Sequence, residues 1–265
     1  MTQTQRIIKY FAIAFAAVII VSLFTWLTVF MNLFSGKGGD VIGEFTNTEY
    51  SGEITKLKID VKAVEFEITE GETFCVGTNN RKISHSLSGK TLTIKESGRG
   101  ITVGDAGKLV LTIPAGYELE VVEIDAGAGV MDIESLSAER IDFELGAGKV
   151  IINKLTVKNS ADIDSGTGTV EITEADIANL DFDLGVGKVE LKGKISGKSD
   201  MDFGVGEAVI GLEGSLDDYS ITVNKGIGSV TIDGKAISDG NRYGEGDSVI
   251  KMDGGVGNIE VYFYD

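Results

Sequence analysis

Residues 141–152, Ile-Asp-Phe-Glu-Leu-Gly-Ala-Gly-Lys-Val-Ile-Ile, decide the fold. Apolar side chains occupy the odd positions up to Leu145 and the even positions from Val150 onward. A period of two is that of a β-strand, so the change of phase requires a corner between two strands. Gly146 and Gly148 stand at the change, and glycine permits the positive φ or tight bend that a corner needs. The stretch therefore predicts two short strands joined at a glycine corner.

This pattern recurs along the chain. G-x-G pairs begin at residues 127, 146, 166, 185, 204, 226 and 255, mostly 19–20 residues apart, and apolar residues flank each pair at the same offsets. A coil of that length cannot bury its own apolar side, so it must stack on the next coil. The repeat predicts an all-β fold, a single-stranded, parallel β-helix-like β-solenoid with coils of about 19–20 residues, which is regular over residues 121–265.

The residues before the regular coils are also rich in strand patterns. Alternating or apolar runs at 56–61, 64–69, 91–95 and 108–113 are separated by turn signals, and Pro114, the only proline, ends the last run. We therefore expect residues 51–120 to form irregular first coils and an N-terminal cap of the same solenoid. A separate small β domain is the alternative. Residues 37–50 are interpreted as a linker.

The N-terminal segment has the composition of a membrane anchor. No charged residue occurs between Lys9 and Lys37, and about 20 apolar residues suffice to cross a bilayer as a helix. A cleaved signal peptide is the alternative, but its apolar region is usually only about 7–15 residues long. Arg6 and Lys9 precede the run, which favours a cytoplasmic N-terminus. Residues 1–36 are thus predicted to be a cytoplasmic tip and one transmembrane helix of a single-pass cell-membrane protein, with an extracytoplasmic C-terminal domain.

Charge and composition restrict the function. The chain has 24 basic and 41 acidic residues, a formal net charge of −17, and this excludes the basic surface that nucleic acids require. Cys75 and His85 are the only cysteine and histidine, so an intrachain disulfide is impossible and a Cys/His zinc site lacks ligands. We predict that the protein is not an enzyme, with no catalytic or cofactor-binding residues and no dependence of activity on His85 or Cys75.

Paired acids precede the corner in five successive coils. The pairs are Glu123/Asp125, Asp142/Glu144, Asp162/Asp164, Asp181/Asp183 and Asp200/Asp202. Because stacked strands lie about 4.8 Å apart, the pairs should form two columns of like charge, an unfavourable arrangement. A solvated face that keeps the protein soluble is one interpretation. The other is a weak calcium site formed by Asp162, Asp164, Asp181 and Asp183, partly neutralised by Lys149 and Lys188.

A family resemblance rests on the segment between the two regions. Leu111-Thr-Ile-Pro-Ala-Gly116 leads through Glu120-Val-Val-Glu-Ile124 into serial G-x-G coils. This resembles the bacterial "putative adhesin" domain of unknown function, as in LiaG-like ectodomains, over roughly residues 50–265. The resemblance implies a β-solenoid on a single-pass or secreted envelope protein, in some cases encoded beside envelope-stress regulators. It carries over no catalytic residues.

Together these observations predict a non-enzymatic binding, scaffolding or sensing module in bacterial envelope maintenance or stress response. Its expected partners are the membrane and either other envelope proteins or cell-wall polymers. A bactofilin-like structural protein is the first alternative, forming homo-oligomers through the coil ends, because Ile259–Tyr264 is apolar enough to present an open strand edge. A polysaccharide-active β-helix enzyme is the second.

Overall fold

The computed structural model describes residues 41–98 and 107–265. The predicted anchor, residues 1–36, and residues 37–40 of the predicted linker lie outside the described residues, whereas Ile42–Tyr50 of that linker is a strand paired with Phe74–Asn80. Apart from the 3-10 turn η1 (Leu216–Asp218), the described elements are strands. They are β1 (Ile42–Tyr50), β2 (Lys56–Gly71), β3 (Phe74–Asn80), β4 (Ile83–Ser88), β5 (Thr91–Glu96), β6 (Lys108–Pro114), β7 (Glu118–Ala178), β8 (Leu180–Ser196), β9 (Lys198–Glu213), β10 (Tyr219–Ile232), β11 (Lys235–Ala236), β12 (Arg242–Tyr243) and β13 (Ser248–Tyr264). Within these ranges no helix has the length and hydrophobicity to cross a bilayer.

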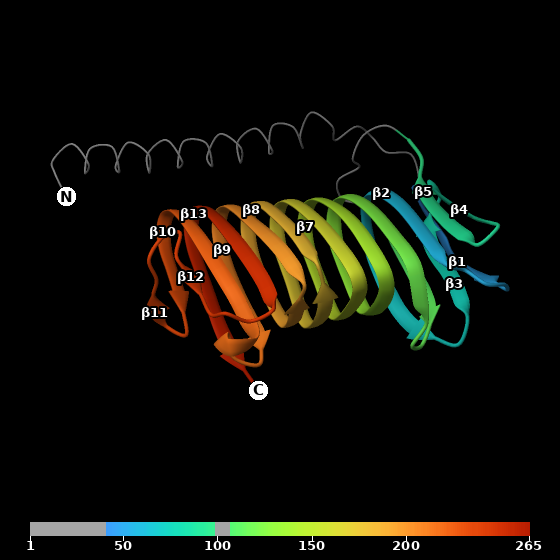
Figure 1. Cartoon of the computed structure of the whole chain (residues 1–265). Helices are drawn as coiled ribbons and strands as arrows, with labels where there is room; N and C mark the ends of the chain where they lie inside the picture. The colour runs from blue at the N-terminus through green and yellow to red at the C-terminus, as the bar shows by residue number, and fades with distance from the viewer. Residues whose placement is uncertain (1–40, 99–106) are drawn as a thin grey trace, which may run out of the picture.

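The strands wind into one stack of coils (Figure 1). The 61-residue β7 passes through several successive coils, and parallel pairing joins it to β2 on one side and β8 on the other. Like positions pair with like: Phe182 lies beside Ile163, and Met201 beside Phe182. The all-β, solenoid-like fold predicted from the repeat is confirmed.

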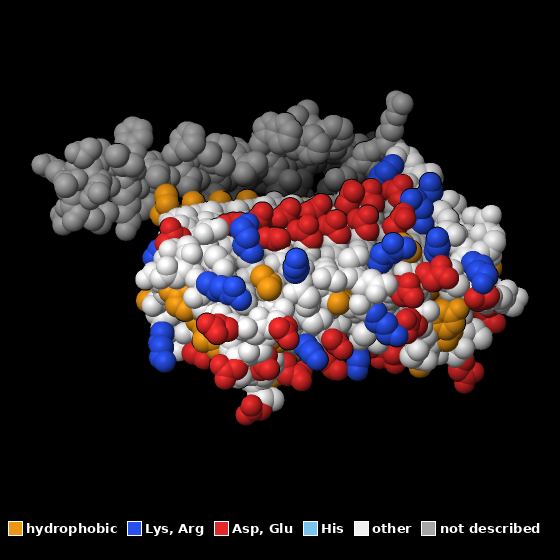
Figure 2. All heavy atoms as spheres, viewed as in Figure 1, with side chains coloured by type: hydrophobic (Ala, Val, Ile, Leu, Met, Phe, Trp, Pro, Cys, Tyr) orange, Lys and Arg blue, Asp and Glu red, His pale blue; other side chains and the backbone are white. Residues whose placement is uncertain are grey.

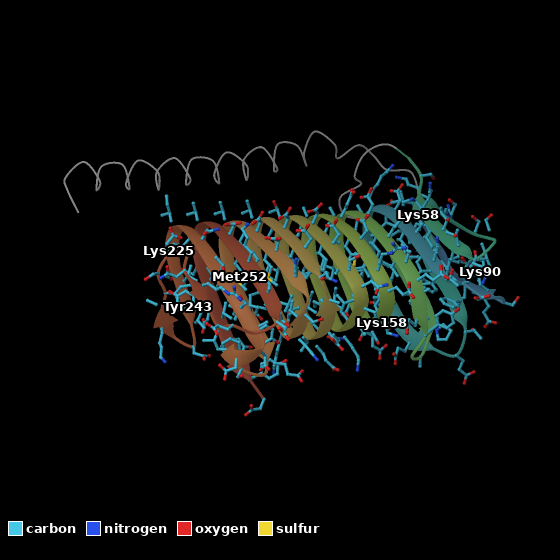
Figure 3. The ribbon with its side chains drawn as sticks, in the orientation of Figure 1. Lys58, Lys90, Lys158, Lys225, Tyr243 and Met252 are labelled. Atoms are coloured by element: carbon cyan, nitrogen blue, oxygen red, sulfur yellow. The ribbon has the colours of Figure 1, made fainter. Side chains whose placement is uncertain are left out.

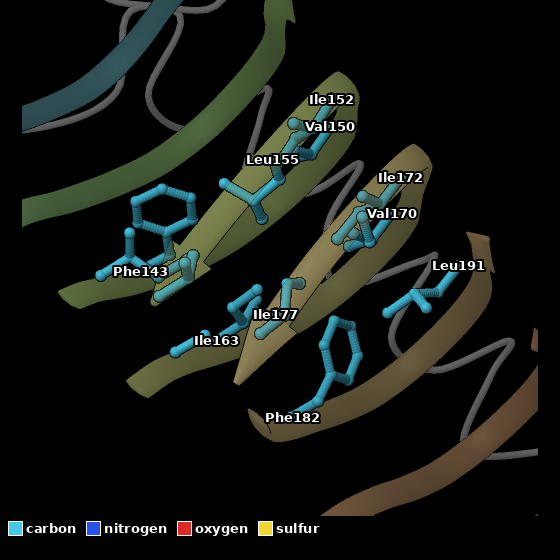
Figure 4. Close-up of a cluster of buried hydrophobic side chains, with 14 of the residues drawn as sticks. Phe143, Val150, Ile152, Leu155, Ile163, Val170, Ile172, Ile177, Phe182 and Leu191 are labelled. Carbon is cyan, nitrogen blue, oxygen red and sulfur yellow. The ribbon is translucent and has the colours of Figure 1, made fainter. Parts of the chain in front are cut away.

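The core fills the inside of the stack (Figure 4). The apolar positions that flank each G-x-G pair are buried in every coil, from Ile124 and Met131 to Met252 and Val261. Leu155, Ile177 and Ile195 are buried on a further side of their coils. Stacking thus removes from water the apolar faces that a single coil would expose.

Each G-x-G pair forms a corner without breaking the strand ladder. Burial changes phase between Leu145 and Val150, as the sequence predicted, yet the register is kept across the corner, with Thr167 beside Val186 and Gly168 beside Gly187. The second glycine of each pair has a positive φ, +147° at Gly187. A Cβ on Gly187 would lie 1.8 Å from the carbonyl oxygen of Gly168 in the preceding coil. Glycine is therefore required here by backbone conformation and by the close approach of the next coil.

The first coil is β2. It pairs in parallel with β7, with Ile59 beside Ile124, and this register places Lys62 and Val64 where the following coils carry glycine. The other edge of β2 pairs with β5 and β6, to which the antiparallel strands β4, β3 and β1 are added. The hydrophobic core is continuous from Ile54 in this region to Val261 in the last strand.

The order of the last coils differs from the sequence order. β13 lies between β9 and β10, paired in parallel with both, although β10 precedes it in the chain. The prediction that Ile259–Tyr264 presents an open edge is therefore wrong, because this segment pairs with Ala208–Glu213 of β9. Linear coil order was assumed, whereas identical glycine registers let β13 fit between two earlier coils.

The end of the stack is formed by β10 instead, and it is partly covered. Tyr243 of β12 pairs with Ile221, and Ala236 of β11 pairs with Thr231. The amide of Gly240 donates to the carbonyl of Val223 at 3.0 Å. Figure 3 shows Tyr243 at this end and Lys58 and Lys90 toward the other. Short covering segments of this kind limit edge-to-edge pairing.

Candidate functional site

The paired acids predicted from the sequence form two columns on one outer face, which we name the acidic columns. In the first column Asp162, Asp181 and Asp200 follow one another in register, and in the second Asp164, Asp183 and Asp202 do so. Coil stacking continues both columns toward β2 through Asp142 and Glu123 and through Glu144 and Asp125. Figure 2 shows them as one acidic band along the stack.

Lysines close the first column at both ends. Lys58 of β2 stands beside Glu123 in the register, with its Nζ 2.5 Å from the Glu123 carboxylate. Lys251 of β13 stands beside Asp200, 3.5 Å from its carboxylate, and also contacts Asp253, which extends the second column. The positive charges that offset the columns thus lie at their ends.

The predicted neutralisation by Lys149 and Lys188 is wrong. Lys149 contacts Glu171 at 3.8 Å, and Lys188 contacts Glu190 at 2.5 Å and Glu207 at 3.7 Å. These residues follow the corner, where the chain has turned to another face, so their ammonium groups pair with the acids of that face. That neighbouring face mixes charge signs, whereas the middle of the acidic columns does not.

The electrostatic environment raises the pKa of several column carboxylates. Partial burial, followed by the neighbouring charges of Asp164 and Asp181, raises the pKa of Asp162 above its ordinary value. Partial burial also raises the pKa of Asp183, with the charge of Asp202 as the next cause. At the lysine end, hydrogen bonds from Lys251 and Asn224 lower the pKa of Asp253 instead. The charged form is therefore disfavoured at Asp162 and Asp183, whereas it is favoured at Asp253 beside Lys251.

The predicted calcium ligands are neighbours but do not converge. Asp162 pairs with Asp181 and Asp164 with Asp183 in the register, and all four side chains are exposed. In the part of the chain that the structure describes, no three carboxylate, histidine or cysteine side chains gather as metal ligands would. The four residues form a charged surface, and calcium binding at them stays a prediction.

A second feature runs beside the columns, the row of middle residues of the coil corners, which we name the corner ridge. In stack order it consists of Ala63, Ala128, Ala147, Thr167, Val186, Val205, Val256 and Ile227. Its side chains grow larger toward β10, where Val256 and Ile227 are 39% and 50% exposed. Figure 2 shows hydrophobic side chains as a row at the edge of the acidic band.

An open groove lies between the columns and the ridge near β13. Asp183, Asp202 and Asp253 line it on the acidic side, and the corner glycines Gly185, Gly204 and Gly255 line it on the other. Leu184 and Phe203, whose side chains belong to the core, also line this shallow groove, and its volume is about 470 Å³. By contrast, a hollow beside the first corners measures only about 30 Å³, far below the roughly 300–1,000 Å³ of small-molecule sites.

The two reactive side chains singled out in the sequence lie in the cap, away from the acidic columns. His85 in β4 is half-buried, and its Nδ1 shares a 2.6 Å hydrogen bond with the Tyr50 hydroxyl. Burial lowers the pKa of His85. Cys75 in β3 is a half-buried free thiol. The hydrogen bond with Tyr50 gives His85 a structural partner.

The end lysines and the corner ridge were missed from the sequence. The run Leu57-Lys-Ile-Asp-Val61 has the same alternation as the glycine coils, but no G-x-G follows it, so no motif marks Lys58 and Asp60 as members of the columns. Lys251 was not considered, because a linear order of coils places β13 at the end of the stack, away from Asp200. The sequence signal for the corner ridge is the middle residue of each G-x-G motif, which is apolar in most coils.

Comparison with known proteins agrees with this architecture. A model of the family described as Toastrack DUF4097 matches residues 54–240. The chain belongs to the Toastrack DUF4097 family. The predicted resemblance to a "putative adhesin" domain of unknown function is thereby confirmed. The family match covers the first coil and most of the glycine coils, so it includes the acidic columns up to Asp202.

Solved structures similar to this Toastrack chain are distant in sequence. A "putative cell adhesion protein" from Clostridium sporogenes is 14% identical, with 83% of this chain and 99% of that chain covered and a TM-score of 0.37. A "putative adhesin" from Bacteroides fragilis is 12% identical, with 82% and 97% covered and a TM-score of 0.37. A "putative lipid binding protein" from Parabacteroides distasonis is 12% identical, with 83% and 97% covered and a TM-score of 0.42. No protein with a curated description matches.

Proposed function

We propose that this protein is a non-enzymatic binding module whose ligand face consists of the acidic columns and the adjoining corner ridge. The main support is that a charged band and an apolar row run side by side over successive coils in one register. Like charges stacked in neighbouring strands are unfavourable, and a positively charged partner would relieve that repulsion. Exposed apolar residues beside the charges would strengthen binding further, because the partner would remove their apolar surface from water.

The partner that best fits this face is a basic amphipathic helix. A helix laid along the stack presents one residue of a given stripe about every 5.4 Å, close to the roughly 4.8 Å spacing of the coils. One stripe of Lys or Arg would follow the acidic columns, and a neighbouring apolar stripe would lie on Val186, Val205 and Val256. Lys58 and Lys251 lie at the two ends of the first column. Their positive charges would repel a basic helix, so the helix would be restricted to the acidic coils between them.

A binding experiment tests this proposal directly. We would titrate the protein with a labelled leucine–lysine helical peptide of about 15 residues, roughly 22 Å long and thus sufficient for five coils. Binding should weaken as NaCl increases, because exposed charges are screened. A peptide with glutamate in place of lysine, and one with serine in place of leucine, should each bind at least tenfold more weakly.

Matched variants of the protein separate the two halves of the face. Asp162→Asn/Asp181→Asn should weaken binding and reduce its salt dependence, whereas Val186→Ser/Val205→Ser should weaken it without changing the salt dependence. Val186 and Val205 are partly exposed members of the corner ridge and are not part of the buried core, so their replacement should leave the core intact. Equal binding of the lysine and glutamate peptides would exclude the acidic columns as the ligand face.

We further propose that residues 1–36 anchor the module in the cell membrane, with the coils on the extracytoplasmic side, in envelope maintenance or stress response. The support is the uncharged run between Lys9 and Lys37 and the basic residues before it. Protease added to intact protoplasts should remove the coils from the cells. Full protection, with degradation after lysis, would contradict this topology.

A further inference from the structure

The insertion of β13 between β9 and β10 has a consequence for assembly. These two strands are consecutive coils in the chain, yet they do not pair with each other. Each instead offers a complete edge to β13. We infer that the space between β9 and β10 is a strand-binding site, which β13 fills in the single chain and which β13 of a second copy can fill in its place.

The contacts in this site are extensive and two-sided. On one edge β13 pairs with β9 from Val249 to Tyr264, and on the other it pairs with β10 from Ser248 to Val261. The inward side chains Ile250, Met252, Ile259 and Val261 are buried in the common core. Without β13, two strand edges about 9.6 Å apart, twice the usual spacing, would have no partner. Such edges are templates for pairing with another chain.

The site selects its occupant through glycine. Gly257 has φ +150°, and a Cβ there would lie 1.7 Å from the carbonyl oxygen of Gly206. A Cβ on Gly255 would lie 2.2 Å from the carbonyl oxygen of Gly204. Only a strand with G-x-G in this register and apolar residues at the flanking positions can enter. Among the described strands, the other G-x-G segments are already built into their coils, so β13 of a second copy is the occupant that fits.

The connection between β10 and β13 permits the exchange. Residues 233–247 are mostly exposed, and they contain only the two-residue strands β11 and β12. Such a connection can serve as the hinge of a strand exchange, which re-forms the same contacts between two molecules. Intramolecular insertion has the advantage of a high effective concentration, in the millimolar range for short flexible linkers. Exchange should therefore need concentrated protein and a transient opening of β13.

The first test measures entry of β13 in trans. A protease site inserted after Asn241 in the full chain would be cut after folding, leaving the fragment that carries β13 held by its strand contacts. An excess of labelled peptide with the sequence of residues 242–265 would then be added at sub-denaturing urea. We expect the labelled peptide to replace the fragment and to co-elute with the protein.

Two peptide variants make this test specific. The Gly257→Val peptide should enter at least a hundredfold less well, because its side chain meets the β9 backbone. The Glu260→Gln peptide, altered at an exposed position, should enter as well as the original. If the fragment leaves and the unaltered peptide does not enter, β10 has closed directly onto β9 and the inference is wrong. Equal entry of the Gly257→Val peptide would also overturn it.

The second test uses two full-length copies with different tags. Copies unfolded and refolded together at high concentration should be captured as mixed dimers, whereas copies mixed after folding should not. Dilution before refolding should abolish capture. Mixed capture that is equal in all three conditions would show association at another surface and would contradict exchange of β13.

Discussion

The first coil, β2, and the glycine coils that follow it have the same apolar pattern but different corners. Lys62-Ala63-Val64 occupies the corner of β2, where the next coil has Gly127-Ala128-Gly129 in the same register. In each glycine coil the missing Cβ would collide with a carbonyl of the coil before it in the stack. No coil precedes β2 at its corner, so side chains fit there. The glycines are therefore required by the neighbouring coil as well as by the bend.

At the corner of β2, which no coil precedes, a side chain accepts the hydrogen bonds of the backbone amides. The amides of Lys62 and Ala63 have no strand partner on that side and donate to one carboxylate oxygen of Glu96, at 2.7 and 3.1 Å. In the glycine coils the residues at the position of Ala63, such as Val186 and Val205, pair with the neighbouring coil instead. A side chain thus replaces a missing coil, which satisfies backbone groups that burial would otherwise make costly.

The largest expected effect comes from adding a Cβ at a glycine with positive φ. Gly187→Ala forces alanine into φ +147° and against the Gly168 carbonyl. Strain of this kind costs about 1–3 kcal/mol and overpacking about 1–3 kcal/mol, so we expect a total loss of roughly 2–6 kcal/mol in the free energy of unfolding, measured by urea denaturation.

Two matched substitutions sharpen this comparison. Gly185→Ala has a close contact of 2.5 Å with the Gly166 carbonyl but no positive φ, so its cost should be smaller, about 1–3 kcal/mol. Lys62→Ala lies at the first-glycine position of β2 and should cost no more than about 0.5 kcal/mol. If Gly187→Ala were as mild as Lys62→Ala, the neighbouring coil would not explain the glycines.

A second prediction concerns the Glu96 carboxylate at the free corner. Glu96→Ala leaves two half-buried amides without their acceptor, and hydrogen bonds to a charged group contribute about 1.5–3 kcal/mol. We expect a loss of about 1–3 kcal/mol in the free energy of unfolding, together with faster amide hydrogen exchange at Lys62 and Ala63. Glu96→Gln keeps an acceptor oxygen and should lose less than half as much. Unchanged exchange in Glu96→Ala would show that the corner needs no side-chain acceptor.

The sequence predicted the glycine coils well because their information is local and repeated. The phase change at Gly146 and the positions of Phe143 and Val150 followed from the period of a strand alone. The pairing of Asp162 with Asp181 then followed from equal spacing. The position of β13 could not be predicted, since Gly257 fits beside Gly206 as well as Gly228 does, and only tertiary packing distinguishes the two orders. Glu96 was also unpredictable, because its role depends on a neighbour that is missing.

The same two regions differ in charge, and this gives a third prediction. β2 contributes Lys58 to the first column, whereas the middle glycine coils contribute carboxylates alone. Replacing Asp162, Asp183 and Asp202 by Asn should relieve repulsion between neighbouring strands, at about 0.2–1 kcal/mol for each contact. We expect the melting temperature at neutral pH to rise by roughly 2–4 °C. Asp60→Asn, in the first coil where Lys58 already supplies a positive charge, should change the melting temperature less.

The pH dependence checks the cause of that change. The pKa values of Asp162, Asp183 and Asp202 are raised in the folded protein, with burial as the first cause and neighbouring carboxylates next. The folded state therefore binds more protons than the unfolded state between the ordinary and the raised pKa, so stability falls as pH rises through this window. The penalty is absent below the ordinary pKa and complete above the raised one. The triple Asn variant should show a smaller decrease across this window; an unchanged slope would assign it to other groups.

The smallest expected effect concerns calcium at Asp162, Asp164, Asp181 and Asp183. These exposed carboxylates belong to the glycine coils, away from the lysines at the column ends, and extracellular calcium sites bind in the millimolar range. At a calcium concentration equal to the dissociation constant, binding to the folded state alone adds about 0.4 kcal/mol, roughly 1 °C in melting temperature. We expect millimolar CaCl₂ to raise the melting temperature by this amount beyond NaCl of equal ionic strength.

Changing the four residues to Asn should remove the excess while raising the calcium-free melting temperature. Glu171→Asn and Glu190→Asn, on the neighbouring face where lysines already pair with the acids, should leave the calcium-dependent excess unchanged. If the unaltered protein responds equally to calcium and sodium, screening alone explains the response, and the acidic columns bind no calcium.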